Sequence, residues 1–425
     1  ACIDASLTPV LGRYLDGLGG RAEAAGLPAP AIMQSNGGVI PIADAARHAA
    51  WTVLSGPAAG VIGATWLARR AGEERVLTFD MGGTSCDVAL VEGEPARTAE
   101  AVIAGHPLHL PMLDVHTVSA GGGSVAWADA GGALRVGPRS AGARPGPAAY
   151  GLGGSEPTVT DANVVLGRLP LDEALGGAVR LDAERAAAAV GALAAEVGLD
   201  SVACAEGILA VAVHEMVRAL RVVSVERGVD PRGMALVAFG GAGPLHACQV
   251  AEELGMRRVI APGAAGMLAA LGLVVAGERQ DRVQSVLLGA GERDRLARWI
   301  DDLRTAAATE LPGAELELAA DCRYAGQSHS LTVAVDPDRL EALGERFHEA
   351  HRRRYGDASP GRPVEVVSLR VGAHRPGAEP DLAGGPPARV VDGPALVPMD
   401  GATCWVAPGW RAEAGADGGV VMERR

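Results

Sequence analysis

Residues 79–90 read Phe79-Asp80-Met81-Gly82-Gly83-Thr84-Ser85-Cys86-Asp87-Val88-Ala89-Leu90. An apolar strand ends in an acid, a pair of glycines makes a turn, and a second acid begins another apolar strand. Glycine has no Cβ atom, so its N–H group can approach an anion closely and contribute to a nest for phosphate oxygens. The segment predicts a β-hairpin whose turn binds phosphate. The alternative is a tight hairpin with a solvated acid at each end.

The same turn carries further groups that suit a phosphate chain. The hydroxyls of Thr84 and Ser85 can donate hydrogen bonds to phosphate oxygens, beside Gly82 and Gly83. Mg²⁺ prefers carboxylate and water oxygens and usually retains several waters. Asp80 and Asp87 are therefore the candidate catalytic acids, and Asp80 is the first candidate ligand for Mg²⁺.

The composition excludes some classes of protein. The chain has 425 residues, enough for two or three domains, and 48% of them are hydrophobic, which argues against extensive disorder. Its formal net charge of −13 argues against a nucleic-acid-binding protein, because binding a phosphate backbone needs clusters of Lys and Arg. Glycine is abundant, at 59 residues, and aromatic residues make up only 3%, which indicates a core of small aliphatic side chains.

The cysteines and the longest uncharged run indicate the cellular compartment of the protein and whether it spans a membrane. Six cysteines are scattered without CxxC spacing, which argues against a zinc ribbon or a disulfide framework and favours a reducing, cytoplasmic setting. Residues 259–277 carry no charge, and their length suits a membrane span. Pro262 and several glycines interrupt this run, so we predict a strand end, a glycine loop and a short buried helix, with no contact to a membrane.

A second glycine-rich turn follows the predicted strand 235–239. Gly240, Gly241 and Gly243 lie between this strand and a helix predicted over 245–254. The unpaired N–H groups and the dipole of a helix N-terminus favour anions and nucleotides. A strict GxGxxG dinucleotide motif is absent, so an NAD site is disfavoured. The alternative is a turn that only lets the helix pack closely on the strand.

A third candidate pairs an acid with an imidazole. Asp114 and His116 are two residues apart, which places both side chains on one side of a strand, where they could bind a divalent metal. The alternative is a hydrogen-bonded pair that orients the glycine loop 121–123. That loop begins an irregular stretch, 119–157, and a long glycine- and proline-rich segment inside a compact protein is more often functional than not.

Hydrophobic periodicity and capping residues predict the remaining elements. We expect a loop at 55–60 before a helix that ends near residue 70. Further helices are predicted over 7–25, 181–197, 201–227, 292–311 and 339–355, and strands over 31–34, 315–324, 328–335 and 364–371.

Several of these segments together resemble the large subunit of the hydantoinase A/5-oxoprolinase family, which is related to the nucleotide-binding subunits of acetone and acetophenone carboxylases. The resemblance rests on segments that occur in family order over nearly the whole chain: 33–38 (MQSNGG), 54–60 (LSGPAAG), 79–85 (FDMGGTS), 120–124 (AGGGS), 238–246 (AFGGAGPLH), 323–327 (RYAGQ) and 408–410 (PGW). It begins about a third of the way into a full family member, so the family's N-terminal phosphate loop is absent from these residues.

The resemblance implies an α/β fold with an actin/sugar-kinase-like ATPase domain over 1–280. The residue pattern itself predicts an α+β domain over 281–375 and, after a proline- and glycine-rich linker, a small β-rich segment over 388–425. It implies that residues 80–87 form the second phosphate loop of this fold, and residues 240–244 the adenosine-binding turn.

The resemblance also implies a reaction. The chain would be a subunit of an ATP-dependent cyclic-amide hydrolase that opens hydantoin or 5-oxoproline through a phosphorylated carbonyl. Its cofactors would be ATP and Mg²⁺, with a possible additional divalent metal, and a hydantoinase B-like subunit would be its partner. The alternatives are a subunit of an acetone-type ATP-dependent carboxylase, which acts on a ketone, and a non-catalytic truncated copy.

Overall fold

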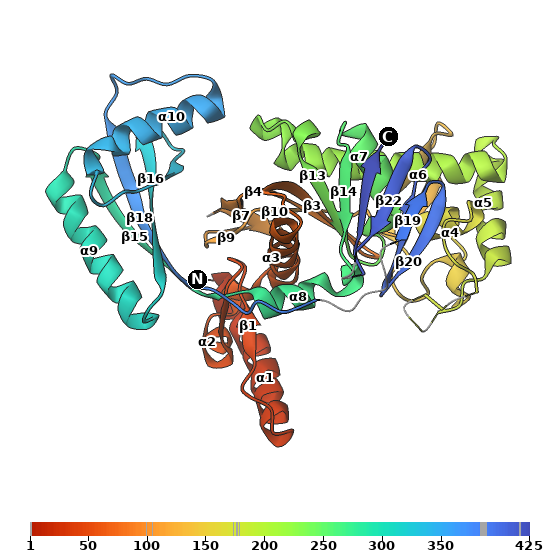
Figure 1. The fold of residues 1–425 in the computed structure, drawn as a ribbon, viewed down its shortest axis with the longest axis horizontal. Helices are drawn as coiled ribbons and strands as arrows, with labels where there is room; N and C mark the ends of the chain where they lie inside the picture. Colours follow the sequence, from red (N-terminus) through yellow and green to blue (C-terminus); the bar gives the residue numbers. More distant parts are fainter. Residues whose placement is uncertain are drawn as a thin grey trace. The chain divides into compact units, whose positions relative to one another are not determined.

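The computed structural model describes residues 2–98, 100–103, 105–172, 174–175, 177, 179–382, 389–415 and 418–425. The chain forms two compact units, each assembled from segments that alternate along the sequence (Figure 1). Unit 1 contains Ala1–Ser55, Thr98–Met112 and Val275–Glu379, and unit 2 contains Gly56–Arg97, Leu113–Val274 and Pro380–Arg425. Residue 388, where we expected the last segment to begin, lies outside the described residues.

Unit 2 is built on a mixed sheet with the strand order β10-β4-β3-β13-β14-β23-β22-β19. The strands are β3 (Arg75–Met81), β4 (Cys86–Glu92), β10 (Val115–Val118), β13 (Ala235–Phe239), β14 (Arg258–Ala261), β19 (Arg389–Asp392), β22 (Trp410–Ala414) and β23 (Val420–Arg424). β3 runs antiparallel to β4 and parallel to β13, and β14 is parallel to β13. The carboxyl ends of β3, β13 and β14 therefore meet at one edge of the sheet.

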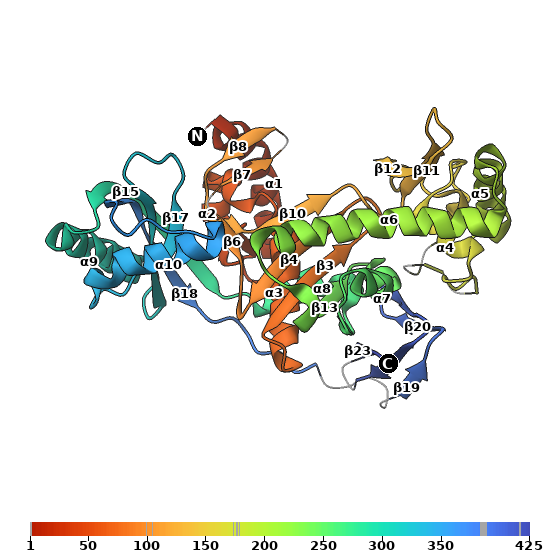
Figure 2. The same cartoon turned by 90° about the horizontal axis from the view of Figure 1, so that it is seen from above.

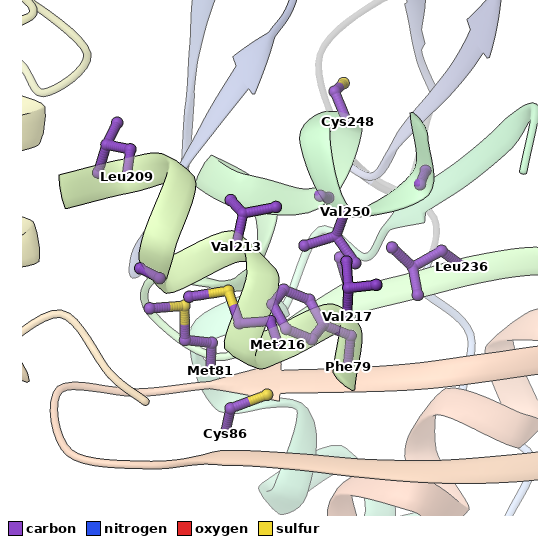
Figure 3. Packing of buried hydrophobic residues seen from close by; sticks show 14 of the residues in the cluster. Phe79, Met81, Cys86, Leu209, Val213, Met216, Val217, Leu236, Cys248 and Val250 are labelled. Carbon is purple, nitrogen blue, oxygen red and sulfur yellow. The ribbon is translucent and has the colours of Figure 1, made fainter. Parts of the chain in front are cut away.

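Helices pack on both faces of this sheet. α3 (Ser55–Arg70), α6 (Ser201–Val223) and α7 (Gly243–Glu253) pack on the sheet, and α4 (Val159–Val165) and α5 (Ala183–Val197) pack on α6. On one face, α6 lies across the sheet and buries Met216 against Phe79 and Met81 (Figures 2 and 3). On the other face, Val61 and Ala64 of α3 join a second buried cluster with the sheet. Because both faces are covered, β13 is entirely apolar and buried, and β3 is buried at every position except Arg75 and Asp80.

The sequence explains where the longest helix of unit 2 begins and ends. The side chain of Asp200 accepts a hydrogen bond from the Ala203 N–H and caps the N-terminus of α6. α6 ends at Val223, four residues before the predicted end at Arg227. A short 3-10 turn, Val225–Arg227, follows it and ends at Gly228, which adopts the left-handed conformation. Half-buried Glu215 and exposed Arg218 form an ion pair at 2.7 Å, because side chains three residues apart are neighbours on a helix.

Unit 1 contains a second sheet with the strand order β1-β2-β15-β18-β16-β17. Its strands are β1 (Ala31–Met33), β2 (Val39–Pro41), β15 (Glu278–Gly289), β16 (Glu315–Tyr324), β17 (Leu331–Ala334) and β18 (Val364–Arg375). Its helices are α1 (Cys2–Ala24), α2 (Ile42–Arg47), α9 (Arg293–Glu310) and α10 (Leu343–Tyr355). α9 and α10 contribute Ile300 and Phe347 to one buried cluster with this sheet.

Shorter strands complete the described chain. They are β5 (Glu94–Pro95), β6 (Arg97–Thr98), β7 (Ala101–Ile103), β8 (His106–Leu108), β9 (Met112–Leu113), β11 (Ser124–Ala128), β12 (Leu134–Ser140), β20 (Ala395–Met399) and β21 (Ala402–Val406). β11 and β12 form a hairpin inside the irregular stretch 119–157.

Two expectations need correction, and others are confirmed. Residues 55–60 form the first turns of α3 and not a loop. The uncharged run 259–277 contains the end of β14, a loop and the helix α8 (Leu268–Val275), as predicted, but Leu273 and Val274 of this helix are exposed. Within the described residues, no helix has the length and apolar character needed to cross a membrane. The six cysteines carry free thiols, as their spacing predicts.

Candidate functional site

The two glycine-rich turns contact each other at one edge of the sheet of unit 2. Asp80, near the end of β3, is in register with Phe239, the last residue of β13. The Met81 carbonyl accepts a hydrogen bond from the Ala242 N–H at 2.9 Å. A Cβ atom on Gly240 would lie only 2.3 Å from Asp80 Oδ1. Gly240 also has a φ of +77°, so glycine is the residue that suits this position.

Asp80 and Asp87 lie directly opposite each other on β3 and β4. Burial, and then the charge of Asp87, raise the pKa of Asp80 to about 6. Burial also raises the pKa of Asp87, although a hydrogen bond donated by the Thr117 hydroxyl opposes this shift. Within the described part of the chain, neither carboxylate forms an ion pair with Arg, Lys or His. The pair is thus two half-buried carboxylates without a balancing cation.

The hairpin turn between the two acids exposes backbone donors. The Gly82 N–H donates to the Ser85 carbonyl at 3.1 Å and closes the turn. Gly83 and Thr84 are exposed, and their N–H groups have no hydrogen-bond partner among the described residues. The residues of this turn that carry hydroxyls are Thr84 and Ser85. Unpaired backbone N–H groups of successive turn residues are a donor set that can bind an anion.

The turn after β13 is anchored to the same edge. The Gly240 N–H donates to the Ala265 carbonyl in the loop after β14, at 2.9 Å. Gly243 begins α7, and a Cβ atom there would lie 3.2 Å from the Phe79 carbonyl. Gly241 is exposed at the tip of the turn. The backbone of this turn therefore packs against β3 and leaves its tip open.

The glycine loop 121–123 contacts the hairpin turn from another side. The N–H groups of Gly122 and Gly123 donate to the carbonyls of Gly82 and Gly83 at 3.0 and 2.7 Å. We did not predict this long-range contact from the sequence, where the loop was only part of an irregular segment. The signal available in the sequence was its run of three glycines, because backbones this close leave no room for Cβ atoms.

Asp114 and His116 lie away from the two facing acids. On β10, Thr117 is in register with Asp87 and His116 with Val88. Neighbouring side chains on a strand point to opposite faces, so His116 points to the face opposite Asp87. The Asp114 carboxylate forms an ion pair with Arg227, just after α6. The structure thus brings Asp80 and Asp87 together but not Asp114 or His116, and no group of three or more potential metal ligands occurs among the described residues.

Comparison with known proteins gives the family. A family model described as hydantoinase/oxoprolinase matches residues 1–282. The chain belongs to this family. It is 37% identical over 387 residues to the caprolactamase subunit alpha of Pseudomonas jessenii, an alignment that covers 86% of this chain and 56% of that protein. It is 38% identical over 305 residues to 5-oxoprolinase 1 of Arabidopsis thaliana, covering 66% of this chain and 23% of that protein. The chain thus spans about half or less of these relatives.

Solved structures agree with this assignment. The crystal structure of the ATP-dependent caprolactamase from Pseudomonas jessenii matches 98% of this chain and 69% of its own, with a TM-score of 0.86 and 32% identity. A nucleotide-free structure of acetone carboxylase matches 97% of this chain and 67% of its own, with a TM-score of 0.74 and 25% identity. These matches confirm the expected family and the α/β, actin-like ATPase fold.

Proposed function

We propose that this chain is a subunit of an ATP-dependent hydrolase of cyclic amides, and that unit 2 binds the nucleotide at the two facing glycine turns. The main support for this proposal is the contact between Gly240 and Asp80. It brings the hairpin turn next to the N-terminus of α7, at the carboxyl ends of two parallel strands, where nucleotides often bind. The names of the matched relatives, an ATP-dependent caprolactamase and a 5-oxoprolinase, support the reaction class.

Each part of the site has a role in this proposal. The N–H groups of Gly83 and Thr84 hold phosphate oxygens, with Gly82 completing the turn and the hydroxyl of Ser85 adding a donor. The adenosine lies against the second turn, where Gly240, Gly241 and Gly243 leave room for it. Phosphorylation of the amide oxygen by ATP would release ADP and make the carbonyl carbon more electrophilic, so that water can add to it. The ring C–N bond would then break with the nitrogen leaving as the amine, and hydrolysis of the resulting acyl phosphate would release inorganic phosphate and the ring-opened acid.

The two acids fit a Mg²⁺ ion. Mg²⁺ is commonly held by one or two carboxylates together with phosphate oxygens and water, and Asp80 and Asp87 face each other without a cationic partner among the described residues. When bound, the ion would neutralise charge on the phosphate chain. Asp80 would hold the ion or orient water, and Asp87 would support it. We place the metal here and not at Asp114 or His116, which point to the opposite side of the sheet.

The assembly and the compartment belong to the same proposal. The subunit name of the caprolactamase relative supports a partner subunit, and we infer one like hydantoinase B. Five buried free thiols suit a reducing compartment such as the cytoplasm.

A carboxylase subunit is the second candidate, because the acetone carboxylase structure also matches nearly the whole chain. Product analysis separates the two candidates. The chain and its partner subunit are incubated with ATP and Mg²⁺, and with caprolactam, 5-oxoproline or hydantoin, or with acetone plus bicarbonate. The hydrolase predicts a ring-opened acid and ADP without bicarbonate. A carboxylated product that requires bicarbonate would favour the second candidate.

The same assay includes variants that test the site. Asp80→Asn is expected to abolish turnover, because it removes a negative oxygen from the proposed metal site. Asp302→Asn, on the exposed surface of α9 in unit 1, serves as the matched control. Nucleotide binding without turnover of any substrate would indicate a non-catalytic copy, and absence of nucleotide binding would overturn the proposal.

A further inference from the structure

The hydrogen bonds of the glycine loop 121–123 determine where the donors of the hairpin turn point. Each peptide group is planar and trans, so its C=O and its N–H point in opposite directions. The Gly82 carbonyl is directed at Gly122, and the N–H of the same peptide group belongs to Gly83. The Gly83 carbonyl is directed at Gly123, and the N–H of that peptide group belongs to Thr84. Both N–H groups therefore point away from the loop, toward the exposed side of the turn.

The glycine loop 121–123 can orient these N–H groups only because its backbone packs directly against the backbone of the hairpin turn. A Cβ atom on Gly121 would lie 2.5 Å from the Thr84 nitrogen, and one on Gly123 would lie 3.0 Å from the Gly83 carbonyl oxygen. A Cβ atom on Gly122 would lie 2.9 Å from the hydroxyl of Thr160. The three glycines are thus enclosed between the hairpin turn and the start of α4.

Thr160 holds the middle of this loop. Its N–H and its hydroxyl both donate to the Gly122 carbonyl, each at 2.8 Å. Its position is fixed in turn by the start of α4, where the buried carboxylate of Asp161 accepts hydrogen bonds from the Thr158 N–H at 2.9 Å and the Ala149 N–H at 2.7 Å. Thr160 is 7% exposed, so solvent does not compete for this bond.

We propose that Thr160 is a positioning residue for phosphate recognition. It holds the glycine loop 121–123 against the hairpin turn, and the loop in turn directs the N–H groups of Gly83 and Thr84 at the phosphate oxygens. This inference rests on the proposed nucleotide site of unit 2. It adds that the affinity for the phosphate part of the ligand depends on a buried hydroxyl that does not touch the ligand.

The test compares ligands with and without phosphate. Calorimetry measures the binding of Mg²⁺·ADP and of adenosine to the full chain and to Thr160→Val, which keeps the shape but removes the hydroxyl. We expect ADP to bind about three- to tenfold more weakly, which corresponds to one hydrogen bond, while adenosine binding is unchanged. Thr160→Ser retains the hydroxyl and is expected to restore ADP binding.

A matched control separates positioning from general loss of stability. Thr65 in α3 is also buried, and its hydroxyl donates to the Val61 carbonyl at 2.7 Å. Thr65→Val is expected to lower the melting temperature by a similar amount without changing the ratio of ADP to adenosine affinity. If Thr160→Val lowers the affinities for ADP and adenosine equally, or lowers neither, the positioning role is overturned.

Hydrogen exchange gives a readout that needs no nucleotide. In Thr160→Val, the N–H groups of Gly122 and Gly123 are expected to exchange faster, because the loop is held less firmly. Unchanged exchange there overturns the role of Thr160, whatever the binding data show. If the wild-type chain does not bind ADP, the nucleotide site itself is refuted, and hydrogen exchange still decides whether Thr160 holds the loop.

Discussion

Gly240 and Asp80 are 160 positions apart in the sequence, yet a Cβ atom on Gly240 would lie 2.3 Å from Asp80 Oδ1. The contact arises because β3 and β13 are parallel neighbours with Asp80 opposite Phe239, so the turn after β13 packs against the end of β3. The turn at Gly240 thus limits the space around Asp80, the candidate metal ligand beside the hairpin turn. We therefore expect some substitutions at this edge of the sheet to change both the stability of the fold and the affinity for the nucleotide. Other substitutions are expected to change only one of the two.

Gly240→Ala is expected to damage both the fold and the site. A left-handed alanine costs about 1–3 kcal/mol, and the new methyl group would also displace Asp80 or Met81. Chemical denaturation should show a loss of at least this size, and calorimetry should show weaker binding of Mg²⁺·ADP. Gly233→Ala is the control, because a Cβ atom on Gly233 would have no heavy atom within 4 Å and its φ is not positive. Equal stability of the two variants would contradict the packing described here.

Asp80→Asn is expected to stabilise the free protein above pH 6. The pKa of Asp80 is about 6 in the folded protein and near 3.8 without burial, so its ionisation opposes folding as the pH rises between these values. The stabilisation should be near zero at about pH 3 and grow to at most about 3 kcal/mol at pH 7.5, since one pKa unit corresponds to about 1.4 kcal/mol.

Denaturant unfolding at several pH values measures this difference, with Asp302→Asn as the control. Mg²⁺·ADP should raise the melting temperature of the wild type but not that of Asp80→Asn, because the ligand stabilises only a chain that binds it. A variant less stable than the wild type at pH 7.5 would show that the Asp80 carboxylate supports the fold, contrary to the geometry of the site.

Thr84→Ala separates binding from stability. Thr84 is exposed, and its hydroxyl has no hydrogen-bond partner among the described residues, so the free energy of unfolding should change by less than about 0.5 kcal/mol. The affinity for ADP should fall about three- to tenfold if the hydroxyl donates to phosphate. Thr305→Ala, at an exposed position of α9, is the control for both measurements. Unchanged ADP affinity in Thr84→Ala would show that this hydroxyl does not bind phosphate.

Asp114→Asn is expected to affect the fold and not the metal. The Asp114 carboxylate pairs with Arg227, and both side chains are largely shielded from solvent, so the loss of the pair should cost about 1 kcal/mol of stability. The Mg²⁺ dependence of ADP binding should stay as in the wild type, both in this variant and in His116→Ala. A weaker Mg²⁺ dependence in a folded variant would instead place a metal on this face of the sheet.

The sequence predicted the local parts of the site well. The hairpin 79–90 and the glycine turn at Gly240 follow from apolar periodicity and glycine chemistry, which act over a few residues. The resemblance to the family joined them into one fold, and the parallel pairing of β3 with β13 is the structural feature that brings them together.

The parts that could not be predicted depend on register and long-range contact. Whether Asp114 faces Asp80 depends on how β10 pairs with β4, and a shift of one residue would reverse the answer. The contact of Gly122 with Gly82 joins two loops that have no periodic pattern of their own. The start of α3 was missed because a Ser-Gly-Pro sequence is typical of loops, although proline is also well tolerated in the first turn of a helix.

The most direct test of the central claim is a crystal structure of the chain with Mg²⁺ and a non-hydrolysable ATP analogue. The account predicts phosphate oxygens within hydrogen-bonding distance of the N–H groups of Gly83 and Thr84, Mg²⁺ beside Asp80, and the adenosine at Gly240–Gly243. A nucleotide bound elsewhere, with the hairpin turn of unit 2 free of phosphate, would contradict it.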